Sequence, residues 1–322
     1  MTFYFTFHEG PSSSIYQTQV LDVLGSLSEE FDSEITLLSF LPVRGFYRNR
    51  RLLKQRSRVN TIVLPHLPFP ALRFWKLNAC LLFPLLLFHR SGKIICRGLF
   101  STSIALTVKR LLPGLKVVFD SRGVVTEEER EYQAYPRHIG GKIAGMESNC
   151  LHRSDFCMFI TVEMVRYFRQ HFGYDSDRYV IIPCTLGDKY ESLVLDMQER
   201  ARVRERLGYT ESDIVLVYSG SNARWQSFEL MISYLSEMLL VNPKIKCLLL
   251  TQKDEVLGAF MEKFPDRVKC SWVEPKLVAE HLVAADYAIL FREPSITNSV
   301  SSPTKFAEYL SCGLPVLANN TM

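Results

Sequence analysis

The chain has 322 residues, of which 47% are hydrophobic and 22% are charged. This is the composition of a globular protein, and it excludes a disordered chain, a collagen-like repeat and a long coiled coil. Its 38 Lys and Arg against 34 Asp and Glu leave a net charge of +4, an excess too small to predict a nucleic-acid partner. The length predicts two domains, each large enough to bury its own core.

Eight cysteines are spread along the sequence without a CxxC pair or a Cys/His cluster of zinc spacing. We therefore expect reduced and mostly buried thiols, no bound metal ion and a cytoplasmic protein. The longest apolar stretch, residues 79–88, falls short of the roughly 20 residues that a membrane-spanning helix needs. The sequence predicts no membrane span.

Short apolar runs alternate with amphipathic stretches through the first half of the chain. The runs are nearly uninterrupted, as in parallel strands that are covered on both faces. We expect strands at residues 3–7, 34–40, 61–64, 93–96, 116–119, 156–160 and 179–182. A helix is expected over 15–31, because Val20, Leu24, Leu27 and Phe31 share one face. Further helices are expected over 101–112, 140–151 and 162–172.

A second series of the same kind begins after about residue 200. It contains expected strands at 213–218, 245–250, 268–270 and 287–291, and expected helices at 225–240, 254–263, 276–284 and 303–311. The polar, irregular segment 183–208, which ends in a charged helix, separates the two series. We therefore predict an α/β protein of two Rossmann-like, doubly wound domains, residues 1–185 and 186–322. Ligands of such folds bind in a cleft at the carboxyl ends of the strands.

The strongest local pattern is the segment 299–317, SVSSPTKFAEYLSCGLPVL, in which a helix is followed by a strand starting at Leu314. Ser302 before Pro303 predicts an N-cap with proline at the first helical position. Such a helix start binds anions, and the cation Lys305 in its first turn suits a bound diphosphate. Glu308, one turn on, could accept hydrogen bonds from sugar hydroxyls. The alternative is an ordinary capped helix with a surface lysine and glutamate.

This segment, with ADYAILFRE at 285–293 before it, resembles the donor-site region of GT-B glycosyltransferases of the GT4 type. It is similar to a subgroup with the pattern Ser-Pro-x-Lys-Phe-x-Glu-Tyr-Leu. The resemblance implies that Glu308 binds the ribose of the nucleotide and that the helix start at Thr304 faces the donor diphosphate. Many members carry a second Glu eight positions earlier, where this chain has Val300, so the paired-glutamate motif is incomplete.

The segment 218–226, YSGSNARWQ, is similar to the first strand and loop of the second domain in that family. Gly220 and Ser221 would let the backbone approach a phosphate closely. Arg224 is a candidate cation for the diphosphate. Alternatively, Asn222 and Gln226 only cap a helix.

In the first domain, the segment 117–129, VVFDSRGVVTEEE, looks like the family loop that often carries a His or Arg facing the donor sugar. Asp120 and Arg122 lie at the carboxyl end of a strand, and we predict a catalytic role for both. Arg122 could neutralise developing negative charge but could not act as a base. The alternative is a local Asp120–Arg122 ion pair. His8, after the first strand, is predicted to be packed or solvated rather than catalytic.

Two further segments raise the question of a membrane surface. Residues 44–58 contain seven Lys and Arg and no acid, which is typical of a solvated loop or of a site for anionic lipid head groups. Residues 72–88 are predicted to form a buried helix kinked at Pro84, and the alternative is a segment that dips into a membrane surface.

The resemblance implies a glycosyltransferase in surface polysaccharide assembly, which moves a sugar from a nucleotide-sugar donor to a glycan or lipid-linked acceptor. It further implies retention of configuration, no metal ion or other cofactor, and a cytoplasmic protein that could be peripheral at the inner face of the membrane. Two alternatives remain open, a sugar-nucleotide epimerase of the same fold and a noncatalytic nucleotide-sugar-binding remnant. The chain stops one strand after the Glu308 helix, so we expect an incomplete second domain.

Overall fold

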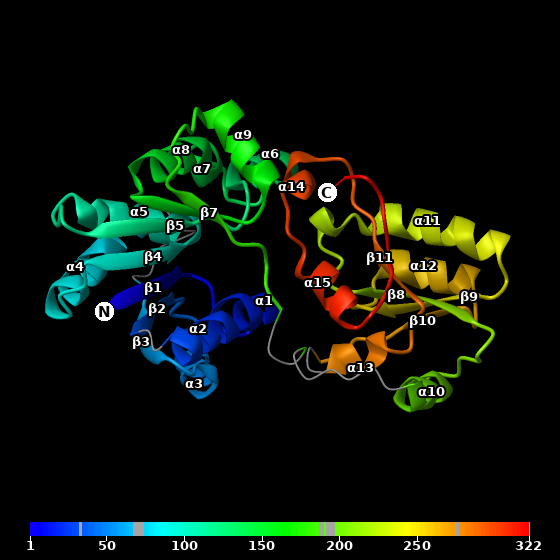
Figure 1. The fold of residues 1–322 in the computed structure, drawn as a ribbon. Coiled ribbons are helices and arrows are strands. Elements are labelled where there is room, and N and C mark those ends of the chain that lie inside the picture. The colour runs from blue at the N-terminus through cyan, green and yellow to red at the C-terminus, as the bar shows by residue number, and fades with distance from the viewer. Residues whose placement is uncertain (32–33, 67–73, 187–189, 191–196, 275–276, 322) are drawn as a thin grey trace. The chain divides into compact units, whose positions relative to one another are not determined.

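Two parallel β-sheets organise the chain, one in each of two compact units (Figure 1). The computed structural model describes residues 1–31, 34–66, 74–186, 190, 197–274 and 277–321. Unit 1 contains residues 1–185 with 300–302, and unit 2 contains residues 186–299 with 303–322.

The described residues of unit 1 form a sheet with the strand order β3-β2-β1-β4-β5-β6-β7, in which all neighbours are parallel. The strands are β1 (Thr2–Phe7), β2 (Ile35–Leu41), β3 (Asn60–Pro65), β4 (Lys93–Arg97), β5 (Lys116–Asp120), β6 (Phe156–Phe159) and β7 (Tyr179–Ile181). All seven predicted strands are confirmed, with ends that differ by at most one residue. Their apolar side chains are covered on both faces, and Phe3, Phe5 and Phe119 are completely buried.

The helices of unit 1 cover both faces of this sheet (Figure 1). On one side lie α1 (Ser14–Tyr16), a π-helical segment (Gln17–Asp22), α2 (Val23–Phe31) and α3 (Phe46–Arg56). On the other side lie a 3₁₀ turn (Trp75–Asn78), α4 (Ala79–Phe88), α5 (Gly98–Lys109), α6 (Val125–Tyr132), α7 (Arg137–Gly140), α8 (Ile143–Arg153) and α9 (Val162–Phe172). Right-handed crossovers produce this division, because the strand order runs in opposite directions from β1 to β3 and from β4 to β7.

Three predictions for unit 1 need correction. Residues 44–58 are not a loop, because α3 occupies most of them and buries Leu53. The predicted helix over 15–31 is interrupted by the π-helical segment, and its last apolar residue, Phe31, is exposed. The predicted buried helix over 72–88 is α4, preceded by the 3₁₀ turn, and residues 72–73 lie outside the described residues. Only one face of α4 is buried, since Phe88 is 82% exposed.

The described residues of unit 2 form a parallel sheet with the order β10-β9-β8-β11-β12. Its strands are β8 (Ile214–Ser219), β9 (Ile245–Leu250), β10 (Val268–Cys270), β11 (Tyr287–Leu290) and β12 (Val316–Ala318). Its helices are α10 (Met197–Arg206), a 3₁₀ turn (Arg224–Gln226), α11 (Phe228–Val241), α12 (Glu255–Lys263), α13 (Val278–Leu282), α14 (Ile296–Ser299) and α15 (Thr304–Ser311).

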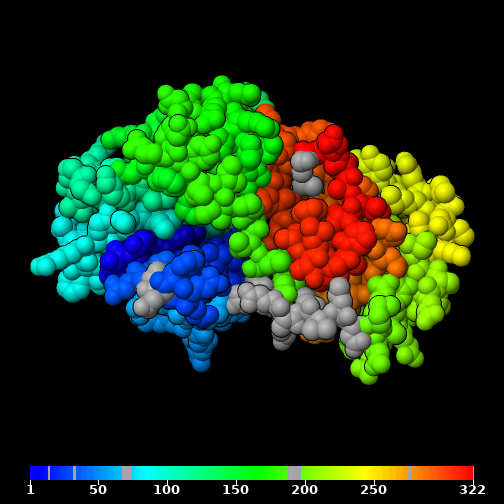
Figure 2. Space-filling view, viewed as in Figure 1, coloured from blue at the N-terminus to red at the C-terminus, as the bar shows by residue number. Residues whose placement is uncertain are grey.

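Alternate residues of β8 face opposite sides of this sheet, as the two-residue period of a strand requires. Leu216 packs in a cluster with residues of α11 and α12, whereas Val215 and Val217 pack in a second cluster with residues of α13 and α15. Unit 2 is therefore doubly wound as well. Figure 2 shows the last segment of the chain, in red, at the surface of this unit.

The predicted elements of unit 2 are present with two changes. The predicted helix over 225–240 is split at Ser227, whose φ of +53° separates the 3₁₀ turn from α11. The strand expected from Leu314 begins later, at Val316. The helix expected over 276–284 is α13, and residue 276 lies outside the described residues.

Candidate functional site

The strand order of each sheet reverses direction at one place, between β1 and β4 in unit 1 and between β8 and β11 in unit 2. Open α/β sheets bind ligands at the carboxyl ends of the strands that flank such a point. Polar and charged side chains gather at both places, and every residue predicted to belong to a site lies near one of them.

In unit 2 the most informative side chain is Lys305, which lies in the first turn of α15 and is only 9% exposed. Its Nζ donates to the phenol oxygen of Tyr218 at 3.1 Å and to Oε1 of Gln226 at 2.7 Å. It also lies 4.3 Å from the centre of the Tyr218 ring. Among the described residues no carboxylate forms an ion pair with Lys305, so both of its hydrogen-bond partners are neutral.

The loop after β8 passes directly against Nζ of Lys305. Gly220 has a φ of +149°, and a Cβ at this position would lie 2.7 Å from Nζ of Lys305. Only glycine fits such a close approach and such a backbone conformation without strain. Gly220 and Lys305 were both predicted site residues, and the structure brings them into contact.

Arg292 is a second buried cation in this region, and the sequence analysis missed it. It lies two residues after the end of β11 and is 4% exposed, with Nη1 donating to the backbone oxygen of Trp225 at 2.6 Å and to Oδ1 of Asn298 at 3.1 Å. Burial and the nearby Arg292 charge hold the pKa of Lys305 well below its usual range. The sequence feature that could have identified Arg292 is its position directly after the apolar run 288–291, at the carboxyl end of a predicted strand.

The other predicted donor residues surround these two cations. Glu308 lies half-buried one turn beyond Thr304, the first residue of α15, and burial with the neighbouring Glu308 raises the pKa of the Tyr190 phenol. Ser221 and Arg224 are exposed in the loop after β8. The phosphate and ribose roles of these residues stay predictions.

The predicted N-cap of α15 is wrong. Pro303 occupies the cap position and no side chain caps the helix. The hydroxyl of Ser302 instead accepts a hydrogen bond from the backbone N–H of Cys184 at 3.0 Å. The first turn of α15 therefore keeps backbone N–H groups that no capping side chain occupies.

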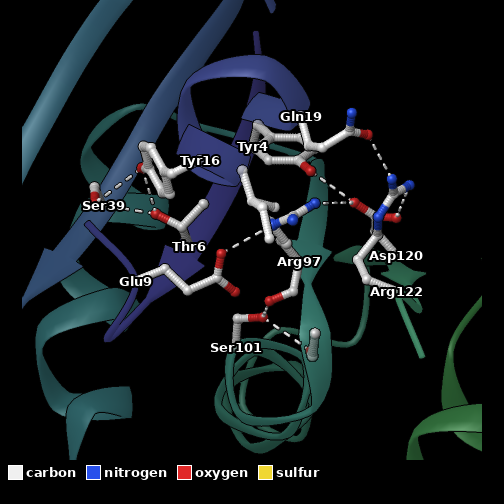
Figure 3. Close-up of polar contacts among 12 residues, drawn as sticks. Tyr4, Thr6, Glu9, Tyr16, Gln19, Ser39, Arg97, Ser101, Asp120 and Arg122 are labelled. Atoms are coloured by element: carbon white, nitrogen blue, oxygen red, sulfur yellow. Dashed lines mark hydrogen bonds and ion pairs between the residues drawn. The ribbon is translucent and has the colours of Figure 1, made fainter. Parts of the chain in front are cut away.

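In unit 1 a buried polar network occupies the carboxyl ends of β1, β4 and β5 (Figure 3). Asp120 is 2% exposed and accepts a hydrogen bond from the phenol of Tyr4 at 2.6 Å. Its carboxylate lies 3.5 Å from Nη1 of Arg122 and 3.9 Å from Nη1 of Arg97. Burial and the Asp120 charge raise the pKa of Tyr4 well above its usual value, so this phenol keeps its proton.

Arg122 is held on three sides. Besides Asp120, its guanidinium contacts Oε1 of Gln19 at 2.8 Å and Sγ of Cys184 at 3.3 Å. The local Asp120–Arg122 pair is thus present, within a larger network than the sequence suggested. The catalytic role predicted for both residues stays a prediction.

Two features of this network were not predicted. Arg97, the last residue of β4, is 6% exposed and donates from Nε to Glu9 at 3.0 Å. His8, at a φ of +68°, forms a hydrogen bond with His66, with 3.0 Å between Nδ1 and Nε2. Burial and the neighbouring His66 lower the pKa of His8.

Comparison with known proteins identifies the fold. No protein-family model and no curated protein sequence matches the chain. The structure is similar to a glycosyltransferase from Rickettsia africae, with 12% identity, 99% of this chain and 79% of that chain covered and a TM-score of 0.67. It is also similar to WaaG, a glycosyltransferase involved in lipopolysaccharide biosynthesis, with 16% identity, coverages of 100% and 81% and a TM-score of 0.66.

A UDP-GlcNAc 2-epimerase from Neisseria meningitidis, solved with UDP-GlcNAc bound, matches with 12% identity, coverages of 99% and 82% and a TM-score of 0.56. At such identities the similarity establishes the fold alone. The chain has the GT-B fold of two Rossmann-like domains, which confirms the predicted fold class.

Proposed function

We propose that this chain is a glycosyltransferase that binds a nucleotide-sugar donor on unit 2 and transfers its sugar to an acceptor. The observation that carries the proposal is the buried side chain of Lys305, which lies against Gly220 near the strand-order reversal of unit 2 and forms no ion pair with a carboxylate among the described residues. Protonating a buried amine that has no carboxylate partner is costly, and a bound anion lowers that cost. A nucleotide-sugar diphosphate is an anion of suitable charge, and other proteins of this fold bind nucleotide-sugars.

In this proposal the donor diphosphate lies against Lys305, Gly220 and the first turn of α15. The backbone N–H groups of that turn, beginning at Thr304, point outward from the N-terminus of the helix. The helix dipole favours negative charge at this end. Arg224 and Ser221, exposed on the neighbouring loop, add a further cation and a hydroxyl.

Glu308 would accept hydrogen bonds from the ribose hydroxyls of the nucleotide. It lies one turn beyond Thr304, in the helix whose first turn would hold the diphosphate. The buried Tyr190 phenol beside the carboxylate would then hold its orientation.

In sugar transfer, the protein can stabilise the negative charge that develops on the leaving diphosphate. As the bond between the sugar and the diphosphate breaks, negative charge grows on the leaving diphosphate, and fixed cations and amide dipoles stabilise it. In unit 1, Arg122 is proposed to act in catalysis by stabilising negative charge, with Asp120 and Gln19 holding its guanidinium in place.

The acceptor is proposed to be a glycan or a lipid-linked glycan in surface polysaccharide assembly, at the cytoplasmic face of a membrane. Support comes from α3, whose Lys and Arg side chains are exposed. A shallow hollow on this helix is lined by Tyr47, Arg48, Arg51, Leu52 and Gln55. Such a cationic surface attracts anionic lipid head groups. In the described part of the chain, no helix is long and apolar enough to cross a bilayer.

Binding and turnover measurements test the proposal. Nucleoside diphosphates and their parent nucleosides are compared on the native chain and on Lys305→Ala, with Lys253→Ala as a control that removes another lysine of unit 2. We expect Lys305→Ala to weaken the diphosphates far more than the nucleosides, and the control to change neither. Equal losses for both ligand types would refute the diphosphate role of Lys305.

A panel of nucleotide-sugars with and without acceptors separates the three candidate activities. Transfer with retained anomeric configuration, read by NMR, supports a retaining transferase. Epimerisation without an acceptor supports the epimerase. Tight binding of a nucleoside diphosphate without any turnover supports the noncatalytic binding protein.

A further inference from the structure

The hydrogen bonds around Lys305 indicate the protonation state of its side chain. The Tyr218 hydroxyl donates to the backbone oxygen of Ser221 at 2.7 Å, so towards Lys305 its oxygen acts as an acceptor. Oε1 of Gln226 is an acceptor as well. A neutral amine has two N–H groups and one lone pair, which is sufficient for both contacts. An ammonium has a third N–H, for which the described residues offer no acceptor.

We propose that Lys305 is a neutral amine in the free protein, and that a diphosphate ligand binds together with one proton, which Lys305 takes up. This inference rests on the proposed donor site and adds how that site responds to pH.

The charges that face Lys305 favour the neutral form. Tyr218 approaches from β8, Arg292 from the end of β11, and Glu308 and Tyr309 from α15 itself. Tyr218 and Tyr309 keep their protons, since burial raises the pKa of both phenols. Glu308 is the one anion in this set, and it forms no ion pair with Lys305 among the described residues. Arg292 is a buried cation that opposes a second positive charge nearby.

Binding of a diphosphate reverses this balance. Its oxygens bring negative charge to the site, and a proton from solvent adds to the Nζ lone pair of Lys305. The resulting third N–H donates to a phosphate oxygen, while the bonds to Tyr218 and Gln226 stay in place. No covalent bond breaks, and the protein gains one proton for each ligand bound. Over the pH range in which this uptake is complete, affinity falls about tenfold for each unit that pH rises.

The uptake is measurable by titration calorimetry in two buffers of different ionisation enthalpy, HEPES and Tris, at a series of pH values. The probes are UDP, ADP, GDP and CDP at pH above about 7, where their terminal phosphate is already ionised, and inorganic pyrophosphate, for which the proton that the free ligand still carries at each pH is included in the proton count. We expect an uptake that approaches about one proton per ligand at its maximum. The ¹³Cε signal of Lys305 in the free protein should titrate at lower pH than those of the other lysines.

Two variants assign the proton to Lys305. Lys305→Arg carries a group that stays charged, so it should bind ligand without taking up a proton. Gln226→Glu places a carboxylate where Oε1 now lies, which favours the ammonium before ligand arrives, and it should reduce the uptake. Arg224→Gln is the matched control, because it removes a permanently charged group from the same turn. It should weaken binding and leave the proton count unchanged.

Each outcome decides one of the two proposals. Nucleotide binding without proton uptake at any pH would overturn the neutral lysine and leave the donor site standing. Equal uptake in the native chain and in Lys305→Arg would overturn it as well. Uptake with pyrophosphate, but no binding of any nucleotide, would support the neutral lysine and refute the nucleotide site. If neither pyrophosphate nor any nucleotide binds, both proposals are wrong.

Discussion

Gly220→Ala tests how closely the loop after β8 and the side chain of Lys305 depend on one another. The new methyl group would lie 2.7 Å from Nζ of Lys305 and 3.3 Å from the hydroxyl oxygen of Tyr218. Ordinary carbon contacts are longer, so Lys305 must leave its position. The backbone at this residue also has a φ of +149°, which an L-residue other than glycine adopts only with strain.

The loss of unfolding free energy in Gly220→Ala has two separable parts. The backbone strain is worth about 1–3 kcal/mol. Displacing Lys305 breaks its hydrogen bonds to Tyr218 and Gln226, each worth about 0.5–1.5 kcal/mol. The total loss of unfolding free energy is therefore about 2–6 kcal/mol. In a Lys305→Met background only the backbone part should remain.

The assay is native-state hydrogen exchange, followed on peptides from β8 and β9 so that it reports on unit 2 alone. Gly258→Ala is the control in the same unit, because Gly258 lies inside α12 and a Cβ there meets its nearest neighbour at 3.7 Å. That variant should gain about 0.5–1 kcal/mol. If Gly220→Ala is as stable as the native chain, or loses the same amount in both backgrounds, the reasoning is refuted.

Three further predictions concern the sites and the pH dependence of stability. Glu308→Ala should weaken nucleosides and nucleoside diphosphates alike by about tenfold or more, measured by calorimetry, since a hydrogen bond to a charged group is worth about 1.5–3 kcal/mol; unchanged affinity in a folded variant would exclude the ribose role. Arg122→Ala should lower kcat and kcat/KM together and leave nucleoside diphosphate affinity intact, whereas a loss of stability without a specific loss of turnover would show a structural ion pair. Burial raises the pKa of Glu147 from 4.5 to about 7. The folded state then binds this proton more tightly than the unfolded state. The unfolding free energy should therefore fall as pH rises from 4.5 to about 7, by about 3 kcal/mol at most. Urea unfolding at a series of pH values measures this slope, and an equal slope in Glu147→Gln would contradict the assignment.

The strands were predictable because their signal is local. A run of apolar residues without a polar break, such as 245–250, fits a parallel strand that is covered on both faces. The helices depended more on context. The seven cations of residues 44–58 suggested a solvated loop, yet Arg, Lys and Leu are good helix formers, and α3 covers most of this segment. This helix packs in a core cluster through the buried Leu53 and the partly buried Phe46.

The site was predictable in part, and the missing part depends on contacts across long sequence separations. The spacing of Lys305 and Glu308 pointed to a donor site, but the burial of Lys305 depends on Tyr218, 87 residues earlier. Ser302 was predicted to be an N-cap because it precedes Pro303. Its actual partner, Cys184, lies 118 residues away and could not be found from the local sequence. Arg292 was given no role from the sequence, because only the fold shows that it is buried near the strand-order reversal of unit 2.

Each unit has a buried arginine near its strand-order reversal, and the groups around the two arginines differ. Each places a buried arginine at the carboxyl end of the strand that flanks its strand-order reversal, Arg97 at β4 and Arg292 at β11. In unit 1 the carboxylates of Glu9 and Asp120 lie within ion-pair distance of Arg97. In unit 2 the hydrogen bonds of Lys305 to the described residues go to the neutral oxygens of Tyr218 and Gln226. An anion beside Lys305 would stabilise its charged form, which is why we assign the diphosphate to unit 2.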